Sequence, residues 1–333
     1  MPPFPGIPYT QAPYYCFPIA ESSMYILFIF CFIHAAKQGV RHVSYLLGGL
    51  LFGLLLEYVN VLSDLGYTYG KFIVMFGRPA LEIPLCIGIG WSIIMYTARL
   101  FADRFQLPLW SAAALDTLLA INIDLSMDAV AYRLHMWHWN WNGTGRNPLI
   151  ADWFGVPFDN FFGWLMVVFF YSSISRLFEA FLLRKKAKAV KFALVPLVSV
   201  LLSQVFLYVM IVYVDVFLED NFGITPLHRF ITFLIILIVV AGRGKRRKKA
   251  PQSTLSVITW LVPIWFHLFF FAWLFIGGFY RESVWLVIAA TLNMLLGISL
   301  HILRLPKTPV NKLFGVEALT KYWRNPKEDV AAD

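Results

Sequence analysis

Residues 192–214 read FALVPLVSVLLSQVFLYVMIVYV, a run of 23 residues without one charged side chain. About 20 apolar residues in a helix cross the roughly 30 Å hydrocarbon core of a bilayer. Eight further segments have this character, at approximately 19–36, 43–65, 80–101, 108–131, 160–183, 229–242, 256–276 and 283–303. Long apolar runs favour helices over barrel strands, which alternate over about ten residues. We expect an all-α, polytopic transmembrane bundle of about nine spans, or eight if the short segment 229–242 does not cross.

The composition agrees with a membrane protein. Apolar residues make up 59% of the 333-residue chain and charged residues only 14%, whereas a soluble domain carries about a quarter charged residues. This excludes an ordinary soluble enzyme, a disordered chain and a disulfide-stapled secreted fold. The three cysteines, Cys16, Cys31 and Cys86, form no CxxC pair, so they predict neither a disulfide framework nor a metal cluster.

The basic residues predict the orientation. If the N-terminus is outside, 21 of the 28 Lys and Arg fall on inner segments, namely 37–42, 99–107, 184–191, 243–255 and the tail after 303. Cytoplasmic segments carry such an excess, so we expect the N-terminus outside and the C-terminus in the cytoplasm. The basic runs are interpreted as topology anchors beside anionic lipid, and no nucleic-acid binding is expected despite the formal charge of +9.

Three regions follow from this map. Residues 1–18 are rich in Pro and Tyr and lack a basic start, so they predict an extracytoplasmic cap and not a cleavable signal peptide. Residues 19–303 form the transmembrane domain, and 304–333 are a polar cytoplasmic tail. The chain contains neither GxxxxGK[ST] nor GxGxxG, so nucleotide use has no support.

Polar residues inside the spans are the strongest functional signal. An acid at the centre of a transmembrane helix costs roughly 2.5 kcal/mol or more, yet the first five spans and their ends carry many polar groups. These are Glu57, Asn60, Asp64, Glu82, Asp116, Asn122, Asp124, Asp128, Asp159 and Asn160. The sixth, eighth and ninth spans contain almost no ionisable groups.

The spacing of the acids brings four of them together. Asp124 and Asp128 are four residues apart and share a helix face. Since the second and fourth spans run in the same direction, Glu57 and Asp64 should lie at a similar depth in the outer half of the bilayer. Several carboxyl groups in one apolar neighbourhood cannot all ionise, and a neutral carboxylic acid is a good proton donor.

Two other interpretations of these acids stay open. They could pair with Arg99, Arg133 or tyrosine hydroxyls and brace the bundle, or they could form a proton or ion pathway. The pair His135-x-x-His138 could bind a metal if both lay on one helix, although an interfacial hydrogen-bonding role is favoured and no metal is expected.

Two further motifs have a structural and a functional interpretation. The segment WHWNWN at 137–142 could be an aromatic belt at the outer interface. The belt is the favoured interpretation, and the alternative is a lid of indole faces over a cavity, since aromatic faces attract cations. Gly49-x-x-x-Gly53 predicts close packing of the second span against a neighbouring helix.

Four stretches resemble a known family. They are LEYVNVLSDLGYTYGKF (56–72), PLCIGIGWSIIMYTAR (84–99), NIDLSMDAVAYRLHMWHWNW (122–141) and WFGVPFDNFFGW (153–164). Together they resemble the carotenoid biosynthesis membrane family, whose best-known members are γ-carotene 1′,2′-hydratases and bisanhydrobacterioruberin hydratases. The resemblance covers about 45–170. Ala129 stands where the family has Pro, the insertion 142–152 is longer than usual, and the last three spans show no match.

The resemblance implies a cofactor-independent, lyase-type hydratase in a bacterial or archaeal cytoplasmic membrane. An acid protonates a terminal isoprenoid C=C bond, and water captures the resulting tertiary carbocation. Asp124 or Asp128 would donate the proton, while Glu57 or Asp64 would hold the partner charge or the water. The expected substrate-binding residues are Trp137, Trp139, Trp164, Tyr67, Tyr69, His138, Asn160 and Asp159.

The partners expected from this reading are an apolar polyene from the bilayer, water and membrane lipids. An isoprenoid cyclase or isomerase would begin with the same protonation, and it would differ in whether water or another alkene captures the cation. A proton-coupled lipid carrier is the alternative from another class of protein, and it would need an aqueous path to both faces of the membrane.

Overall fold

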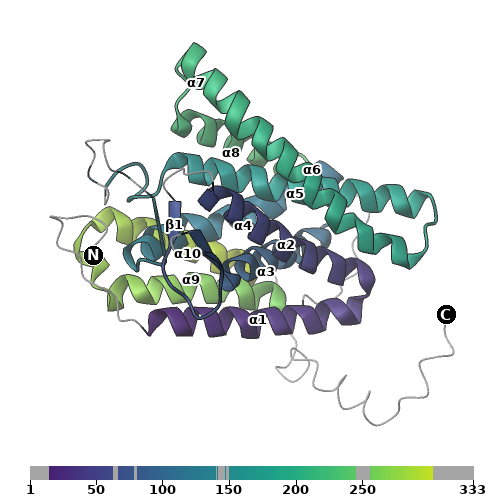
Figure 1. The fold of residues 1–333 in the computed structure, drawn as a ribbon, viewed down its shortest axis with the longest axis horizontal. Helices are drawn as coiled ribbons and strands as arrows, with labels where there is room; N and C mark the ends of the chain where they lie inside the picture. Colours follow the sequence, from purple (N-terminus) through teal and green to yellow (C-terminus); the bar gives the residue numbers. More distant parts are fainter. Residues whose placement is uncertain are drawn as a thin grey trace, which may run out of the picture.

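The computed structural model describes residues 15–62, 67–78, 81–139, 141, 147, 150–244 and 256–302. Helices dominate these residues and run roughly along one long axis (Figure 1). The α-helices are α1 Cys16–Gln38, α2 Val40–Leu62, α3 Leu85–Asp103, α4 Leu109–Arg133, α5 Phe158–Arg184, α6 Val195–Tyr208, α7 Val216–Phe222, α8 Pro226–Gly242, α9 Ile258–Ile276 and α10 Val284–Ile302. A 3-10 turn η1 (Ala189–Leu194) precedes α6, a π-helical segment η2 (Val209–Asp215) joins α6 to α7, and a short turn η3 (Phe279–Arg281) precedes α10.

The predicted transmembrane bundle is confirmed. Within the described part of the chain, seven helices are long and apolar enough to cross a membrane, and they are α1, α2, α3, α5, the continuous helix Val190–Phe222, α9 and α10. The two remaining predicted spans are also helical: α8 is apolar but has 17 residues, and α4 has 25 residues and carries three acids. The orientation of the bundle stays a prediction.

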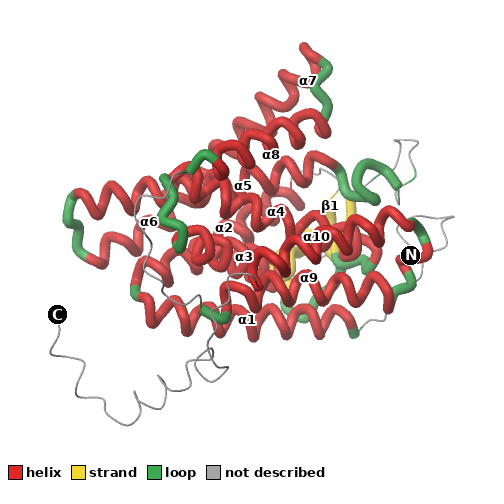
Figure 2. Tube along the Cα trace, turned by 180° about the vertical axis from the view of Figure 1, so that it is seen from behind, coloured by secondary structure: helices red, strands yellow, loops and turns green. Residues whose placement is uncertain are grey.

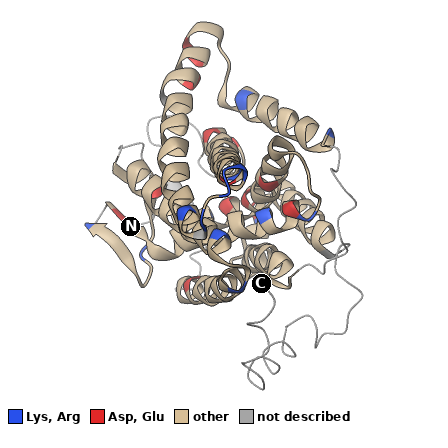
Figure 3. Cartoon of the chain, turned by 90° about the vertical axis from the view of Figure 1, so that its right-hand side faces the viewer, with Lys and Arg blue, Asp and Glu red and all other residues tan. Residues whose placement is uncertain are grey.

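Helix α4 lies inside the bundle, which explains how it accommodates its acids. It packs against α3, α5, α8, α9 and α10, and Figure 2 shows it enclosed among other helices. Seen along the bundle, acidic and basic residues lie within the ring of helices as well as around it (Figure 3). Because protein and not lipid surrounds α4, its carboxyl groups avoid the cost of facing hydrocarbon.

Close packing of α2 on α3 confirms the expectation from Gly49-x-x-x-Gly53. A Cβ atom built on Gly49 would lie 3.1 Å from the Cα of Ser92, and one built on Gly53 would lie 2.7 Å from the Cβ of Trp91. The two glycines therefore allow the helix backbones to approach each other.

The beginning of the third span differs from the prediction. The strands β2 (Met75–Arg78) and β3 (Leu81–Pro84) pair in antiparallel fashion, and α3 starts only at Leu85. Pro84 disfavours helical geometry at Ile83, and Gly77 adopts φ +112° opposite Glu82. Glu82 therefore lies in β3 and does not open a membrane span.

A second pair of strands covers one end of the bundle. Strand β1 (Tyr67–Tyr69), which follows α2, pairs in antiparallel fashion with β4 (Trp137–Trp139), which follows α4, so that Tyr67 lies opposite Trp139 and Tyr69 opposite Trp137. Figure 2 shows β1 at this end. Helix α4 ends at Arg133, and His135 has a left-handed backbone with φ 61°. His135 and His138 therefore do not share a helix, and the arrangement in which both would bind a metal from one helix face is not formed.

An ionic network braces the opposite half of the bundle. Asp116 accepts hydrogen bonds from Arg176 Nη2 at 2.8 Å and from Ser172 Oγ at 2.5 Å, and Arg176 also pairs with Asp103. Arg99 binds Glu179 through two hydrogen bonds of 2.7 and 2.9 Å. Asp116 therefore pairs with an arginine and holds helices together, as one of the interpretations of the buried acids expects.

The described contacts of Arg99 and Arg133 lead to residues other than Asp124 and Asp128. Arg99 is engaged by Glu179, and Arg133 contacts Glu282 at 2.7 Å and the carbonyl oxygens of Ala129 and Phe154. The predicted tail 304–333, most of the N-terminal cap 1–18, and Asp64 lie outside the described residues.

Candidate functional site

A cavity of about 460 Å³ lies between α2, α3 and α5 and is covered by the continuous helix of α6, η2 and α7. This volume falls in the range of small-molecule sites, roughly 300–1,000 Å³. Nine of the twelve predicted site residues line it, namely Glu57, Tyr67, Tyr69, Asp128, Trp137, Trp139, Asp159, Asn160 and Trp164. Residues far apart in the sequence thus meet at one place, although their catalytic and binding roles stay a prediction.

Of the other three predicted residues, only Asp124 can be placed in full. Its side chain is 0% exposed and lies behind Asp128, which is 2% exposed and faces the cavity. Asp64 and the side chain of His138 lie outside the described part of the structure.

Two aspartates and one asparagine form the first polar cluster of the cavity. Asn160 Nδ2 donates a hydrogen bond to Asp128 Oδ2 at 2.7 Å and lies 3.4 Å from Asp124 Oδ2. Asp124 and Asp128 lie one helical turn apart on α4, and the single Asn160 amide reaches both carboxyl groups. Two neighbouring buried carboxyl groups do not both ionise readily. The Asp124/Asp128 pair is therefore suited to hold one acidic proton.

Glu57 forms the second polar cluster, on the α2 side. Its carboxyl group accepts hydrogen bonds from Trp91 Nε1 at 2.8 Å and from Asn60 Nδ2 at 3.5 Å, and Tyr69 lines the cavity beside it. Donors directed at a carboxyl group stabilise its ionised form. The cavity thus has a pair of carboxyl groups from α4 and a further carboxyl group, with its own donors, from α2.

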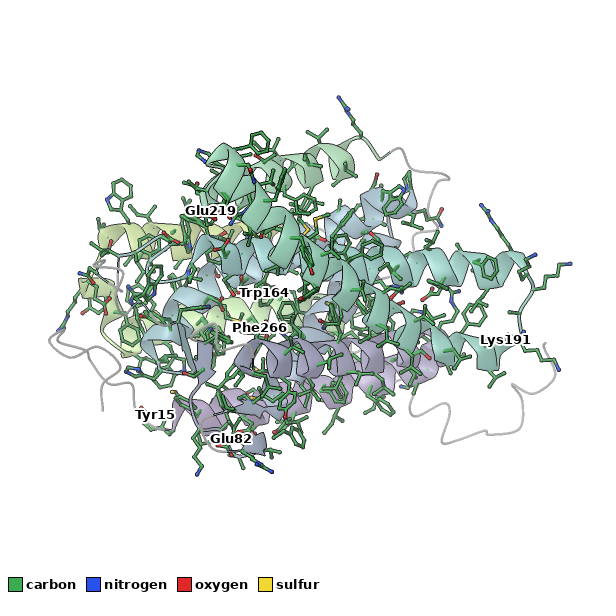
Figure 4. The ribbon with its side chains drawn as sticks, turned by 45° about the horizontal axis from the view of Figure 1, so that its top comes forward. Tyr15, Glu82, Trp164, Lys191, Glu219 and Phe266 are labelled. Carbon is green, nitrogen blue, oxygen red and sulfur yellow. The ribbon has the colours of Figure 1, made fainter. Side chains whose placement is uncertain are left out.

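Aromatic rings form much of the wall between these clusters. Trp91 and Trp164 stack with ring centroids 3.9 Å apart, and Tyr67 and Trp139 lie 5.4 Å apart. Trp137 is only 5% exposed and lines the cavity together with Trp139, so these two rings favour the lid over the interfacial belt. In Figure 4, Trp164 and Phe266 lie near the middle of the bundle, at the centre of this region.

The two cavity tyrosines remain neutral over the physiological range. Both lie on β1, outside the membrane-spanning helices. Burial, together with the nearby Glu57 carboxyl group, raises the pKa of Tyr67 and of Tyr69 well above the ordinary value. Their hydroxyl groups can therefore donate and accept hydrogen bonds in the site.

An arginine with three acids borders the other side of the cavity. Arg229 of α8 pairs with Asp159 at 2.9 Å, Glu219 at 3.1 Å and Asp215 at 3.4 Å. Asp159, which the sequence predicts to bind substrate, is therefore held in an ion pair. The group joins α5, η2, α7 and α8 around the cavity.

Sequence reasoning missed several residues of this site. Trp91 looks like an ordinary apolar residue of a span, and only the packing of α3 against Gly53 shows that it faces Glu57. Arg229 and Asp215 come from distant segments, and Phe266 comes from α9. A buried arginine beside a span end is a sequence signal that could have marked Arg229 as paired.

Comparison with known families identifies a match that includes most of the helices and strands around the cavity. Residues 21–226 match the family described as carotenoid biosynthesis protein, which is more than half of the chain. The matched segment includes both carboxyl clusters and ends before Arg229. No curated protein and no solved structure matches the chain.

Proposed function

The chain belongs to the carotenoid biosynthesis protein family, and we propose that it is a hydratase that adds water to a terminal C=C bond of a polyene. The observation that carries this proposal is the pair of unlike carboxyl systems facing one cavity. The Asp124/Asp128 pair shares the amide donor of Asn160, whereas Glu57 accepts hydrogen bonds from Trp91 and Asn60. Hydration is redox-neutral and needs an acid and a base, which these two systems can supply.

The proposed reaction has two steps. In the first, the Asp124/Asp128 pair gives its proton to the less substituted carbon of the terminal C=C bond, and the π electrons form the new C–H bond. The other carbon becomes a tertiary carbocation. In the second step the oxygen of water bonds to that carbon, and the proton released by this water passes to Glu57. The product is a tertiary alcohol, and its formation consumes one water molecule.

The walls of the cavity suit the charge that develops in this reaction. The faces of Trp91 and Trp164 would lie beside the carbocation, and an aromatic face stabilises a cation by about 0.5–2 kcal/mol. Preorganised groups of this kind act only when the charge appears. The aromatic wall therefore favours a cationic path over direct addition of hydroxide.

The polar groups favour water as the partner that captures the cation. A buried water needs about two to four polar partners, and Asn60, Asn160 and the Glu57 carboxylate all line the cavity. A cyclase would instead place a second alkene against the cation and exclude water from it. For this reason hydration ranks above cyclisation or isomerisation.

The substrate would reach the site from the bilayer. Ile211 of η2 lines the cavity and is also 36% exposed, on a helix that is apolar enough to cross a membrane. The neighbouring lining residue Leu207 is buried and apolar. An opening at Ile211 would therefore face lipid, which is where an apolar polyene is dissolved.

Product analysis tests the proposal directly. The chain is expressed in cells that accumulate lycopene and γ-carotene, and the extracted pigments are separated and weighed by mass spectrometry. A more polar pigment heavier by 18 Da is expected, since hydration adds one water. A pigment of altered retention but unchanged mass would indicate a cyclase or isomerase. Unchanged pigments with well-inserted protein would overturn catalysis on these polyenes.

Single substitutions test the roles of the acids. Asp124→Asn and Asp128→Asn each remove an acidic proton while keeping the size of the side chain, so each should abolish product without loss of folded protein. Asp220→Asn is the matched control, because Asp220 is exposed and does not line the cavity. Full activity in both Asp124→Asn and Asp128→Asn would contradict the proposed acid.

A further inference from the structure

The proposed hydration leaves a proton at the wrong carboxyl group, and the inference below rests on that proposed function. After one turnover Glu57 carries the proton taken from water, and the Asp124/Asp128 pair has lost its own. The next turnover requires one proton to move back. The two systems belong to different helices, α2 and α4, so the return needs a path across the cavity.

A chain of two tyrosine hydroxyls begins at Glu57. Tyr69 lines the cavity together with Glu57, and the hydroxyl oxygens of Tyr67 and Tyr69 lie 3.2 Å apart, so that either hydroxyl group can donate to the other. The two residues are two apart on β1, so both side chains point to the same face of the strand. The hydroxyl chain thus leads away from Glu57 along the lid of the cavity.

The same strand pair extends to the aspartates. Strand β4 pairs with β1, and its Trp137 lines the same cavity as Asp128. Tyr67 and Tyr69 of β1 line this cavity as well. One small sheet therefore borders the cavity that both carboxyl systems share, and it carries the two hydroxyl groups.

We propose that Tyr67 and Tyr69 form a proton relay that returns the proton from Glu57 to the Asp124/Asp128 pair after each turnover. The Glu57 O–H bond breaks as its proton joins the oxygen of Tyr69, whose own proton passes to the oxygen of Tyr67. The Tyr67 proton passes through one cavity water to Asp128. One proton moves in total, each oxygen that gains a proton loses one, and nothing is oxidised or reduced.

Among the neighbours of Glu57 that the structure describes, the hydroxyl groups are suited to this transfer. The indole N–H of Trp91 and the amide N–H of Asn60 donate to Glu57, but these nitrogen atoms do not accept a proton in return. A tyrosine hydroxyl both donates and accepts. Because both phenols keep their protons at ordinary pH, the relay passes through neutral tyrosines and needs no tyrosinate.

The number of turnovers distinguishes a relay from a structural role. Purified protein in detergent is mixed with excess polyene, and the 18 Da heavier product is counted against protein over time. Tyr67→Phe and Tyr69→Phe should each form about one product per protein in a first phase, and every later turnover should be slower than that phase by about tenfold or more. Tyr58→Phe is the control, since Tyr58 of α2 is 41% exposed and does not line the cavity.

Each outcome has a definite meaning. Added imidazole, a small proton carrier, should restore the later turnovers of both relay variants if proton return limits them. Wild-type rates in every turnover would overturn the relay. Loss of the first turnover as well would also overturn it, because the tyrosines would then hold substrate or structure. A wild-type protein that forms no heavier product would instead refute the proposed hydration, and thermal unfolding of each variant verifies that it is folded.

Discussion

Substituting Gly53 by alanine tests the link between helix packing and the site. A Cβ atom at this position would lie 2.7 Å from the Cβ of Trp91, 2.8 Å from its Cδ1 and 2.9 Å from its Cγ. The indole cannot easily move away, because it stacks on Trp164 at 3.9 Å and donates to Glu57 at 2.8 Å. Either α2 separates from α3, or Trp91 leaves both partners.

The expected cost follows from these contacts. Forcing an extra carbon into a packed interface costs about 1–3 kcal/mol, while replacing glycine by alanine within a helix returns up to about 1 kcal/mol. Gly53→Ala should therefore lower the free energy of unfolding by about 1–2 kcal/mol. Hydration should slow as well, because the same change displaces the aromatic wall and the donor to Glu57.

Gly163 provides the matched control. It lies on α5 and lines the same cavity, yet a Cβ atom built there would meet nothing within 4 Å. Gly163→Ala should raise stability by up to about 1 kcal/mol through helix propensity alone. Both variants are unfolded in detergent and followed by circular dichroism, with product formation measured in parallel. If Gly53→Ala proves as stable and as active as Gly163→Ala, the close contact at Trp91 does not exist as described.

Three further predictions follow from named contacts. Arg176→Met leaves Asp116 buried without its ion pair and should cost about 3–5 kcal/mol of unfolding free energy; a loss below about 1 kcal/mol in denaturant titration would disprove the brace. Asn160→Leu removes the donor to the Asp124/Asp128 pair, a hydrogen bond worth about 1.5–3 kcal/mol, so the hydration rate should fall about tenfold or more in a folded protein; an unchanged rate would show that Asn160 does not position the acid. The pKa of Tyr67 is raised in the folded state, whereas in the unfolded state it is about 10. At pH values above about 10 the folded state therefore binds more protons than the unfolded state. Stability should therefore fall as pH rises above about 10, and Tyr67→Phe should fall less steeply in melting temperature measured from pH 8 to pH 11; parallel curves would contradict this.

The helical architecture could be predicted from the sequence because hydropathy reports directly on the solvent of each segment. Each of the nine predicted segments corresponds to a helix, and most of the helix ends lie within a few residues of the predicted ends. The error at Glu82 has a physical cause. The stretch LEIP is apolar enough to join the following helix in a hydropathy window, while the proline and the pairing with β2 make it a strand.

The polar half of the site could also be predicted, since carboxyl groups in apolar spans are costly and therefore stand out. Glu57 and Asp128 do face one cavity. The partners of these acids could not be predicted, because partnership depends on the angle at which two helices meet. Trp91 became visible as a site residue only through its contacts with Glu57 and Gly53. The pairing of Asp116 with Arg176 likewise spans two helices and separates Asp116 from the cavity.

The C-terminal helices contribute to the cavity although they lie outside the family match. Arg229 of α8 and Phe266 of α9 line it, and both follow residue 226, where the matched segment ends. His267, next to Phe266, lies with its Nε2 3.1 Å from Asn122 Oδ1 and with its Nδ1 3.4 Å from Ser126 Oγ. Both of these partners belong to α4, so α9 is fixed to the helix that carries the proposed acid.

Helix α10 completes this support. A Cβ atom on Gly297 would lie 2.1 Å from the Nε2 of His267, so only glycine lets α10 approach so closely. Asn122 Nδ2 also reaches the carbonyl oxygen of Asn293 at 3.2 Å. At about 100° per residue, Asn122 and Ser126 lie on the opposite face of α4 from Asp124 and Asp128. The aspartates face Asn160 of α5, and the polar groups on the other face find their partners on α9 and α10. The helix that carries the proposed acid is therefore held from both sides, and on one side by helices beyond the matched segment.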